Sequence, residues 1–226
     1  MLCIPKVLDA PQVAHCRRVL EDTPWVDGAI TAGQQSAKAK HNLQVPEDAP
    51  QARALQDLIL GQLGQNPTFI SAALPSRVFP PLFNRYEAGM GFGSHIDNAF
   101  RVSAERGARY RTDLSCTLFL SDPRDYDGGE LVIESPTPRP PVKLPAGDMI
   151  LYPASSVHRV TPVTRGARWA SFFWVQSMVR SGEQREILHD LDRSVSQVRD
   201  ALGEEHAAAV SLTGHYHNLL RQWAEP

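Results

Sequence analysis

The chain has 226 residues, of which 42% are hydrophobic and 21% charged, and its formal net charge is −2. This near-balance of charge argues against a nucleic-acid-binding protein and against a long disordered or acidic tail. No apolar run reaches the length of a membrane span, and Pro5, Lys6 and Asp9 interrupt the first residues, so we expect a cytoplasmic protein without a membrane segment or an export signal.

Cysteine usage narrows the class further. The cysteines are odd in number and widely spaced: Cys3, Cys16 and Cys116. They fit a reducing compartment and exclude both a disulfide scaffold and a paired-cysteine zinc site. The length favours one domain over two.

The first 65 residues are predicted to form helices joined by loops. Residues 11–20 follow Asp9, a good N-cap residue, and carry apolar side chains at helical spacing. After a loop through Gly28 and Gly33, residues 51–63 repeat this pattern, which is typical of an amphipathic helix packed on a sheet.

Residues 66–178 are predicted to be β-structure, because Pro and Gly divide this part into short apolar runs. The expected strands cover residues 112–121, 130–134, 142–144, 149–152 and 168–175. The expected turns cover residues 127–129, 145–148 and 165–166, the first as a hairpin turn. The second turn would join residues 142–144 and 149–152 as a hairpin. Short antiparallel strands at this spacing indicate a sandwich or a barrel.

Residues 179–226 return to helical periodicity. Apolar residues recur at intervals of three and four over residues 187–198 and again over 212–223. We therefore expect a domain of residues 1–178, with its β core at 78–178, followed by a C-terminal helical extension.

The most informative stretch is RYEAGMGFGSHIDN, residues 85–98. His95 and Asp97 are two positions apart, so an extended strand would place both side chains on one face, where they can bind one metal ion. His158 follows the strand of residues 149–152 and would lie opposite His95 if the sheets roll up. Two histidines and one carboxylate form the facial triad of iron(II) oxygenases, which leaves coordination positions open.

Arg168 lies ten residues after His158, at the start of the next expected strand. A buried arginine opposite a metal can form a bidentate pair with a distal carboxylate, as 2-oxoglutarate would require. Alternation along the strand places Trp174 on the face of Arg168 and Ser171 on the other. We therefore expect Trp174, rather than Ser171, to line the cosubstrate pocket.

Three segments carry a family resemblance: Tyr86-x8-His95-x-Asp97-Asn98, then DGGEL at residues 127–131, then His158-x9-Arg168-x5-Trp174. They resemble the prolyl-4-hydroxylase-type iron(II)/2-oxoglutarate dioxygenases. The whole chain is similar to the bacterial PKHD-type hydroxylases. Residues 25–44 and 213–225 resemble the terminal segments of that family. The resemblance implies an α+β protein with a mainly β core, a double-stranded β-helix (jelly roll) with N-terminal helices packed on one sheet.

The resemblance also implies roles for single residues. His95, Asp97 and His158 would bind Fe(2+), Arg168 would bind the carboxylate of 2-oxoglutarate, and Tyr86 would be a second contact to this cosubstrate. The implied reaction hydroxylates an unactivated C–H bond and releases succinate and CO2, with L-ascorbate restoring oxidised iron.

The chain departs from the animal prolyl hydroxylases at one position that bears on cosubstrate binding. Those enzymes carry a tyrosine on the strand that aligns with residues 115–121, where this chain has Leu118 and Phe119. Either that hydrogen bond to the cosubstrate is missing or Tyr86 supplies it.

The substrate stays open between a small molecule and a peptidyl group. A sensor that binds iron and 2-oxoglutarate without turnover is an alternative to an enzyme. A zinc hydrolase is another, but it leaves Arg168 unexplained and lacks an obvious general base. The C-terminal helices either cover a sheet or form a homo-oligomer.

Basic side chains cluster near the predicted metal ligands. Residues 100–111 contain Arg101, Arg106, Arg109 and Arg111, which either rim the active site and attract an anionic substrate or belong to a solvated loop. Lys40, Asn42 and Gln44 are further candidates for the mouth of the site. Four other histidines are expected to form no second metal site: His41, His189, His215 and His217.

Overall fold

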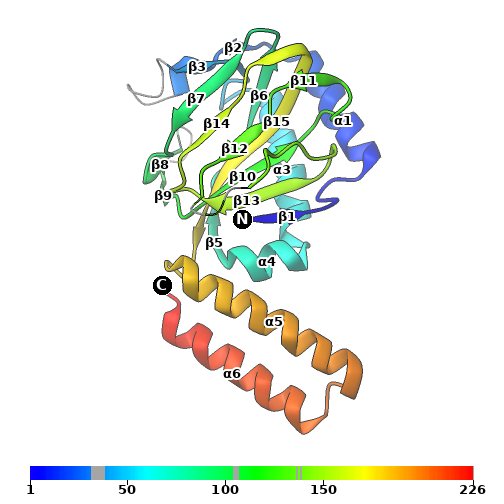
Figure 1. Cartoon of the computed structure of the whole chain (residues 1–226), viewed down its shortest axis with the longest axis vertical. Coiled ribbons are helices and arrows are strands. Elements are labelled where there is room, and N and C mark those ends of the chain that lie inside the picture. The colour runs from blue at the N-terminus through cyan, green and yellow to red at the C-terminus, as the bar shows by residue number, and fades with distance from the viewer. Residues whose placement is uncertain (32–38, 104–106, 136, 138, 226) are drawn as a thin grey trace.

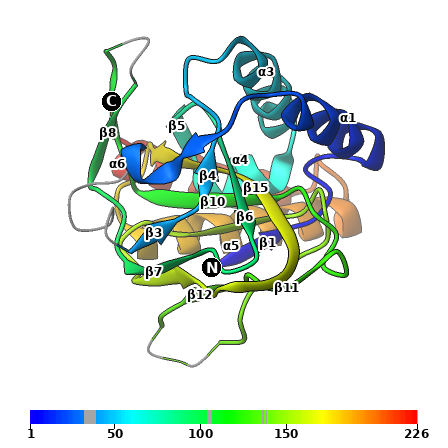
Figure 2. The same ribbon diagram turned by 90° about the horizontal axis from the view of Figure 1, so that it is seen from above.

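The computed structural model describes residues 1–31, 39–103, 107–135, 137 and 139–225 (Figure 1). Two facing β-sheets form the body of the molecule, and helices cover the outer face of the larger sheet (Figure 2). A helical hairpin at the C-terminus extends away from this body. This is the predicted jelly roll with helices on one sheet and a helical extension.

The larger sheet contains the strands that run through the centre of the molecule. Its order is β1 (Leu2–Ile4), β13 (Met149–Pro153), β10 (Leu114–Phe119), β15 (Val163–Ser177), β6 (Leu82–Glu87), β4 (Leu43–Gln44) and β2 (Val26–Asp27). Two further strands, β11 (Tyr126–Gly128) and β5 (Pro75–Val78), pair with opposite ends of β15. The long strand β15 therefore holds this sheet together.

The smaller sheet has the order β12 (Leu131–Ile133), β14 (His158–Val160), β7 (Gly91–His95) and β3 (Lys40–His41). Beside it, β8 (Phe100–Val102) and β9 (Arg109–Arg111) form a separate two-stranded ribbon. A short 3-10 helix, η1 (Gly28–Thr31), precedes β3. An apolar cluster that includes Tyr86, Phe119 and Val160 contains side chains from both sheets.

The N-terminal helices pack on the larger sheet as their apolar spacing predicts. Helix α1 (Ala10–Glu21) begins at Asp9, which forms a capping box with Gln12. Helix α3 (Pro50–Gly64) starts with Pro in its first turn, where a missing backbone N–H is tolerated. Both helices bury one apolar face in the main core.

Helix α4 (Pro67–Ala73) corrects the prediction that β-structure starts at residue 66. The Asn66 side chain accepts a hydrogen bond from the backbone N–H of Phe69, and Pro67 occupies the first turn. The buried side chains Phe69 and Ala73 anchor this short helix to the core, which makes it stable despite its length.

The predicted hairpin of residues 142–144 with 149–152 is wrong. Strand β13 pairs with β1 and β10 in the larger sheet, while Val142 forms only an isolated bridge with Leu131 next to the smaller sheet. The turn between them is held by Gly147, whose N–H donates to Phe119 and whose carbonyl accepts from Leu8. The chain therefore crosses between the sheets at a point where a local hairpin was expected.

Two other predicted turns also differ. Residues 127–129 do not close a hairpin, because β11 pairs with β15 and β12 pairs with β14 in the other sheet. Residues 165–166 do not form a turn, since β15 continues through them and Gly166 pairs with Tyr126. Gly166 has a φ of +71°, and a Cβ there would lie 2.0 Å from the carbonyl oxygen of Asp125. A glycine that looks like a turn residue therefore allows close approach inside a strand.

The C-terminal hairpin consists of α5 (Gly182–Leu202) and α6 (Ala207–Trp223), as the periodicity predicts (Figure 1). Its base packs on the body through Val179 and Leu188, which contact Leu74. Arg111 of β9 also forms an ion pair with Glu225, with 3.1 Å between Nη1 and Oε2. Among the described helices, none is long and apolar enough to cross a membrane.

Candidate active site

His95, Asp97 and His158 converge between the two sheets. His95 ends β7 and His158 begins β14, and these residues are direct cross-strand partners. One ligand atom from each of the three residues lies within 4.8 Å of the others, and the His158 Nε2 to Asp97 Oδ2 distance is 3.9 Å. Antiparallel pairing therefore brings together residues that are 63 positions apart in the chain.

Backbone carbonyls orient both imidazole rings. The Nδ1 of His95 lies 2.8 Å from the carbonyl oxygen of Gly93, and the Nδ1 of His158 lies 3.0 Å from that of Ser156. A carbonyl oxygen can only accept a hydrogen bond, so each Nδ1 carries the proton. In the neutral imidazole this tautomer leaves the Nε2 lone pair for a metal ion.

Burial and hydrogen bonding prepare the site further. Burial, reinforced by the neighbouring His158, lowers the pKa of His95 to about 4, so this ring is neutral at physiological pH. The Oγ of Ser115 donates to Asp97 Oδ2 at 2.5 Å, which holds the carboxylate in place. Two imidazole nitrogens and one carboxylate oxygen form a donor set that suits a divalent transition metal.

Arg168 is the largest of the fully buried side chains, with 1% of its surface exposed. It pairs in register with Tyr86, and its guanidinium carbon lies 5.4 Å from the Tyr86 ring and 5.1 Å from the Phe119 ring. Within the described part of the chain, its Nε makes no hydrogen bond and no carboxylate lies within ion-pair distance. A buried guanidinium without an acidic partner is costly, and a bound anion would remove that cost.

Two phenol groups lie beside Arg168. Tyr86 lines the cavity, and burial raises its pKa, so the hydroxyl remains a neutral donor. Tyr126, which sequence reasoning missed, is fully buried, and its hydroxyl makes no hydrogen bond to any described residue. Burial raises the pKa of Tyr126 as well, while the nearby Arg168 charge opposes this shift. The one sequence signal for Tyr126 was its position directly before the DGG segment of residues 127–129.

Gly129 provides the space that Arg168 needs. It has a φ of +66°, and a Cβ there would lie 3.2 Å from Arg168 Cδ and 2.9 Å from Val163 Cγ2. The glycine therefore allows the backbone to pass close to the buried arginine. Within residues 127–129, where the sequence predicted only a hairpin turn, Gly129 therefore lies next to the buried arginine.

The three candidate metal ligands, Tyr86 and Arg168 line a cavity with an empty volume of about 810 Å³, part of it open to solvent. The lining residues are Lys40, Asn84, Tyr86, Phe92, His95, Ile96, Asp97, Asn98, Arg101, Ser115, Cys116, Thr117, Leu131, Tyr152, His158, Val160, Arg168, Phe172, Phe173 and Trp174. Trp174 is six residues from Arg168 on β15, a separation of about 20 Å. It pairs in register with Ser115, so it borders the Asp97 side of the cavity instead of the Arg168 side.

The arginines of residues 100–111 have different environments. Arg101 lines the cavity, whereas Arg109 lies over the Phe100 ring and Arg111 pairs with Asp113 and Glu225. Arg106 lies outside the described residues. The prediction of an arginine-lined mouth therefore applies to one described arginine, Arg101.

The other residues suggested for the mouth of the site also differ in their positions. Lys40 lines the cavity and donates a hydrogen bond to Gln44 at 3.0 Å. Asn42 and Gln44 are buried and do not line the cavity, which corrects that suggestion. The strand pairing of β4 with β6 covers Gln44, which explains its burial.

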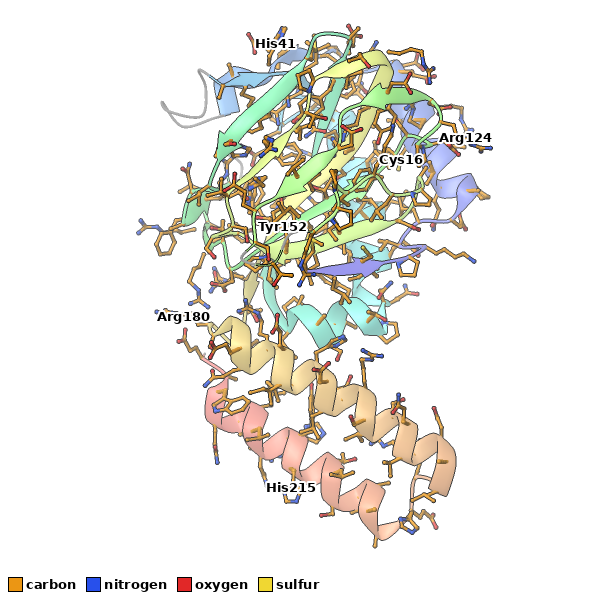
Figure 3. All side chains as sticks on the ribbon, in the orientation of Figure 1. Cys16, His41, Arg124, Tyr152, Arg180 and His215 are labelled. Carbon is orange, nitrogen blue, oxygen red and sulfur yellow. The ribbon has the colours of Figure 1, made fainter. Side chains whose placement is uncertain are left out.

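The remaining candidate histidines are scattered. His41 is exposed on β3, and His215 is exposed on α6, far from the body (Figure 3). His189 shares a hydrogen bond with Ser71 Oγ at 2.9 Å, and His217 is exposed. Across the part of the chain that is described, His95, Asp97 and His158 form the one cluster suited to a metal ion.

Two family models match the chain. The model described as 2OG-Fe(II) oxygenase superfamily matches residues 81–176, which include every residue of the triad and Arg168. The model described as PKHD-type hydroxylase C-terminal domain matches residues 183–225, the helical hairpin.

Curated relatives align with the chain from end to end. A PKHD-type hydroxylase of Gluconobacter oxydans is 56% identical over 225 residues, covering 100% of this chain and 99% of the relative. A PKHD-type hydroxylase of Paracoccus denitrificans is 52% identical, also over 225 residues, with the same coverage.

Solved structures share the fold at low identity. A Pseudomonas putida prolyl-4-hydroxylase has a TM-score of 0.53 and 19% identity, covering 78% of this chain and 91% of that one. A Trichoplax adhaerens prolyl hydroxylase, in complex with a hypoxia inducible factor peptide fragment, has a TM-score of 0.53 and 13% identity, covering 83% of this chain and 86% of that one. HygX of Streptomyces hygroscopicus, with nickel, 2-oxoglutarate and hygromycin B bound, has a TM-score of 0.50 and 18% identity, covering 76% of this chain and 80% of that one.

Proposed function

Because the chain belongs to the PKHD-type hydroxylases, and is therefore a 2-oxoglutarate-dependent iron(II) dioxygenase, we propose that His95, Asp97 and His158 hold its iron. The two free Nε2 lone pairs and one Asp97 oxygen supply three ligands, which leaves coordination positions for 2-oxoglutarate and dioxygen. Arg168 binds the distal carboxylate of 2-oxoglutarate. The observation that carries this assignment is the buried Arg168 guanidinium, which has no carboxylate partner among the described residues.

Iron and 2-oxoglutarate, when bound, supply the oxidation of an unactivated C–H bond by dioxygen, with release of succinate and CO2. The protein residues hold and shield that chemistry. The carbonyls of Gly93 and Ser156 keep both rings turned toward the metal position, and Ser115 fixes the Asp97 carboxylate. The buried rings of Tyr86 and Phe119 exclude water around Arg168, which strengthens its pairing with a carboxylate.

Several finer assignments complete the proposal. The Tyr86 hydroxyl is a second contact to 2-oxoglutarate, and its position next to Arg168 in register supports this role. Trp174 lines the part of the cavity that receives the substrate, on the opposite side of the iron position from Arg168. The substrate is a small molecule or a peptidyl group, since relatives by fold hold either a peptide or hygromycin B. The division at residue 178 separates the dioxygenase domain from the hairpin, which is available for self-association.

The setting of the reaction is also proposed. L-ascorbate restores iron that becomes oxidised in cycles without hydroxylation. The protein works in the cytoplasm, and its three cysteines support a reducing compartment because each of them is a free thiol.

The test is to add iron(II) and 2-oxoglutarate to the protein under anaerobic conditions and to record the visible spectrum. We expect a weak charge-transfer band, and succinate after oxygen is admitted. Arg168→Ala should weaken 2-oxoglutarate binding by roughly 1.5–3 kcal/mol, because a buried charge-assisted pair is lost. Arg165→Ala is the matched control, since this exposed arginine on the same strand pairs with Asp127 outside the cavity.

Two results would contradict the proposal. One is the absence of a visible band when bound iron is demonstrated by metal analysis. The other is an equal loss of 2-oxoglutarate affinity in Arg168→Ala and in Arg165→Ala.

A further inference from the structure

Tyr126 is a fully buried tyrosine that the proposed function leaves without a role. Its side chain is 0% exposed, and its hydroxyl makes no hydrogen bond to any described residue. The Nε of Arg168 is in the same state, since it is buried and has no hydrogen-bond partner among the described residues. Unpaired polar groups are costly inside a protein, so a donor and an acceptor that are both unpaired are suited to each other.

The side chains of Tyr126 and Arg168 meet above the backbone of Gly129. A Cβ on Gly129 would lie 3.1 Å from Tyr126 Cε2 and 3.2 Å from Arg168 Cδ. Cε2 is bonded to the carbon that carries the hydroxyl, and Cδ is bonded to Nε. Burial raises the pKa of Tyr126, and the charge of Arg168 is the largest of the causes that oppose this rise. The hydroxyl is therefore close to the guanidinium.

Backbone pairing and a lysine hold Tyr126 in place. Tyr126 pairs in register with Gly166, which lies on β15 just before Arg168. Lys143 donates a hydrogen bond to the Tyr126 carbonyl at 2.6 Å, and its Nζ lies 4.1 Å from the centre of the Tyr126 ring. The tyrosine is thus fixed relative to β15, whereas the arginine side chain has several rotatable bonds.

The two residues differ in their access to the cavity. Arg168 lines it, and Tyr126 does not. Any effect of Tyr126 on a ligand in the cavity therefore passes through Arg168.

We propose that Tyr126 is a positioning residue for Arg168: its hydroxyl oxygen accepts a hydrogen bond from Arg168 Nε when 2-oxoglutarate is bound, which leaves the terminal guanidinium nitrogens to the distal carboxylate. This inference rests on the proposed function and adds to it the group that orients the arginine. The direction of the hydrogen bond is fixed, because arginine has donors only and a phenol oxygen accepts. The Phe119 ring, 5.1 Å from the guanidinium carbon, has no hydroxyl and does not fill this role.

The test measures, by calorimetry, how tightly the full-length protein with anaerobically bound iron(II) binds 2-oxoglutarate and 2-oxopentanoate. The second compound has the same chain length and the same chelating end but no distal carboxylate, so it does not use Arg168. Tyr126→Phe removes only the hydroxyl. It should weaken 2-oxoglutarate binding about tenfold, because the charged pair loses the hydrogen bond that orients it. Binding of 2-oxopentanoate should be unchanged, a result that a general structural defect would not give.

A double variant shows whether Tyr126 acts through Arg168. Arg168→Ala should weaken 2-oxoglutarate binding, and Tyr126→Phe added to it should cause no further loss. Tyr110→Phe is the matched control, since this buried tyrosine packs on Phe79 and does not line the cavity. It should bind both compounds like the wild type.

The inference is overturned, with the proposed function intact, if Arg168→Ala weakens 2-oxoglutarate binding and Tyr126→Phe does not. It is also overturned if Tyr126→Phe weakens both compounds equally, or if the two losses add in the double variant. Unchanged 2-oxoglutarate affinity in Arg168→Ala would overturn the proposed function, and the inference with it.

Discussion

The two ends of the active-site cavity are built differently. At the closed end, Arg168, Tyr86 and Phe119 are each at most 1% exposed. At the open end, Lys40 and Arg101 are partly exposed. The closed end is made by neighbouring central strands of the larger sheet, whereas the open end is made by an edge strand and a separate ribbon.

We expect this difference to separate the chemistry of the site from its choice of substrate. Central strands are held by pairing on both sides, so they fix the positions of Arg168 and Tyr86, which we propose to bind the cosubstrate. Edge strands and ribbons have fewer constraints, so their side chains can differ without disturbing the interior. Changes at the closed end should therefore alter iron or 2-oxoglutarate binding, and changes at the open end should alter substrate binding.

The largest effect is expected where the two ends meet, at the triad. Asp97→Ala removes the one carboxylate of the donor set, so iron binding and succinate formation should both be abolished. Iron content after anaerobic loading and gel filtration measures this loss. His41→Ala, an exposed histidine on β3, should bind iron like the wild type. Full iron content in Asp97→Ala would remove this residue from the proposed site.

A smaller effect is expected from Ser115, which touches the metal site only through Asp97. Ser115→Ala removes the hydrogen bond to Oδ2 and should lower iron affinity about 10- to 100-fold. Ser171→Ala is the matched control, since this buried serine donates to the Leu82 carbonyl on the other face of β15. Both variants should lose about 1 kcal/mol of stability in urea unfolding. Equal iron affinities in the two variants would show that Ser115 has only a structural role.

Gly129 tests how closely the closed end is packed. Gly129→Ala should weaken 2-oxoglutarate binding about tenfold and destabilise the fold by about 1–3 kcal/mol, because the new methyl group crowds Arg168 and Val163 and the backbone has a positive φ. Gly107→Ala is the control, with a φ of +57° and, apart from its chain neighbours, no atom of a described residue within 4 Å of the new Cβ. It should lose stability through backbone strain alone and keep its 2-oxoglutarate affinity. Equal effects on 2-oxoglutarate would exclude crowding of Arg168 as the cause.

Local patterns predicted the helices and much of the β core. Asp9 and the apolar spacing of residues 11–20 specify α1, and residues 114–119 are a strand by their own apolar character. Helix α4 was missed because its start depends on one cap, Asn66, in a segment where Pro also fits a β turn. The resemblance supplied the fold class, and the matching family and solved structures confirm it.

The sequence by itself determined which side chains the chemistry has, although β7 ends at His95, so Asp97 lies just beyond the strand on which the spacing had placed both groups. Only the tertiary structure decided what joins them. It brought His158 opposite His95, placed Tyr126 beside Arg168, and moved Trp174 to the far end of the cavity from Arg168. Spacing along one strand is a local property of the backbone, whereas pairing between strands depends on the path of the whole chain between the sheets.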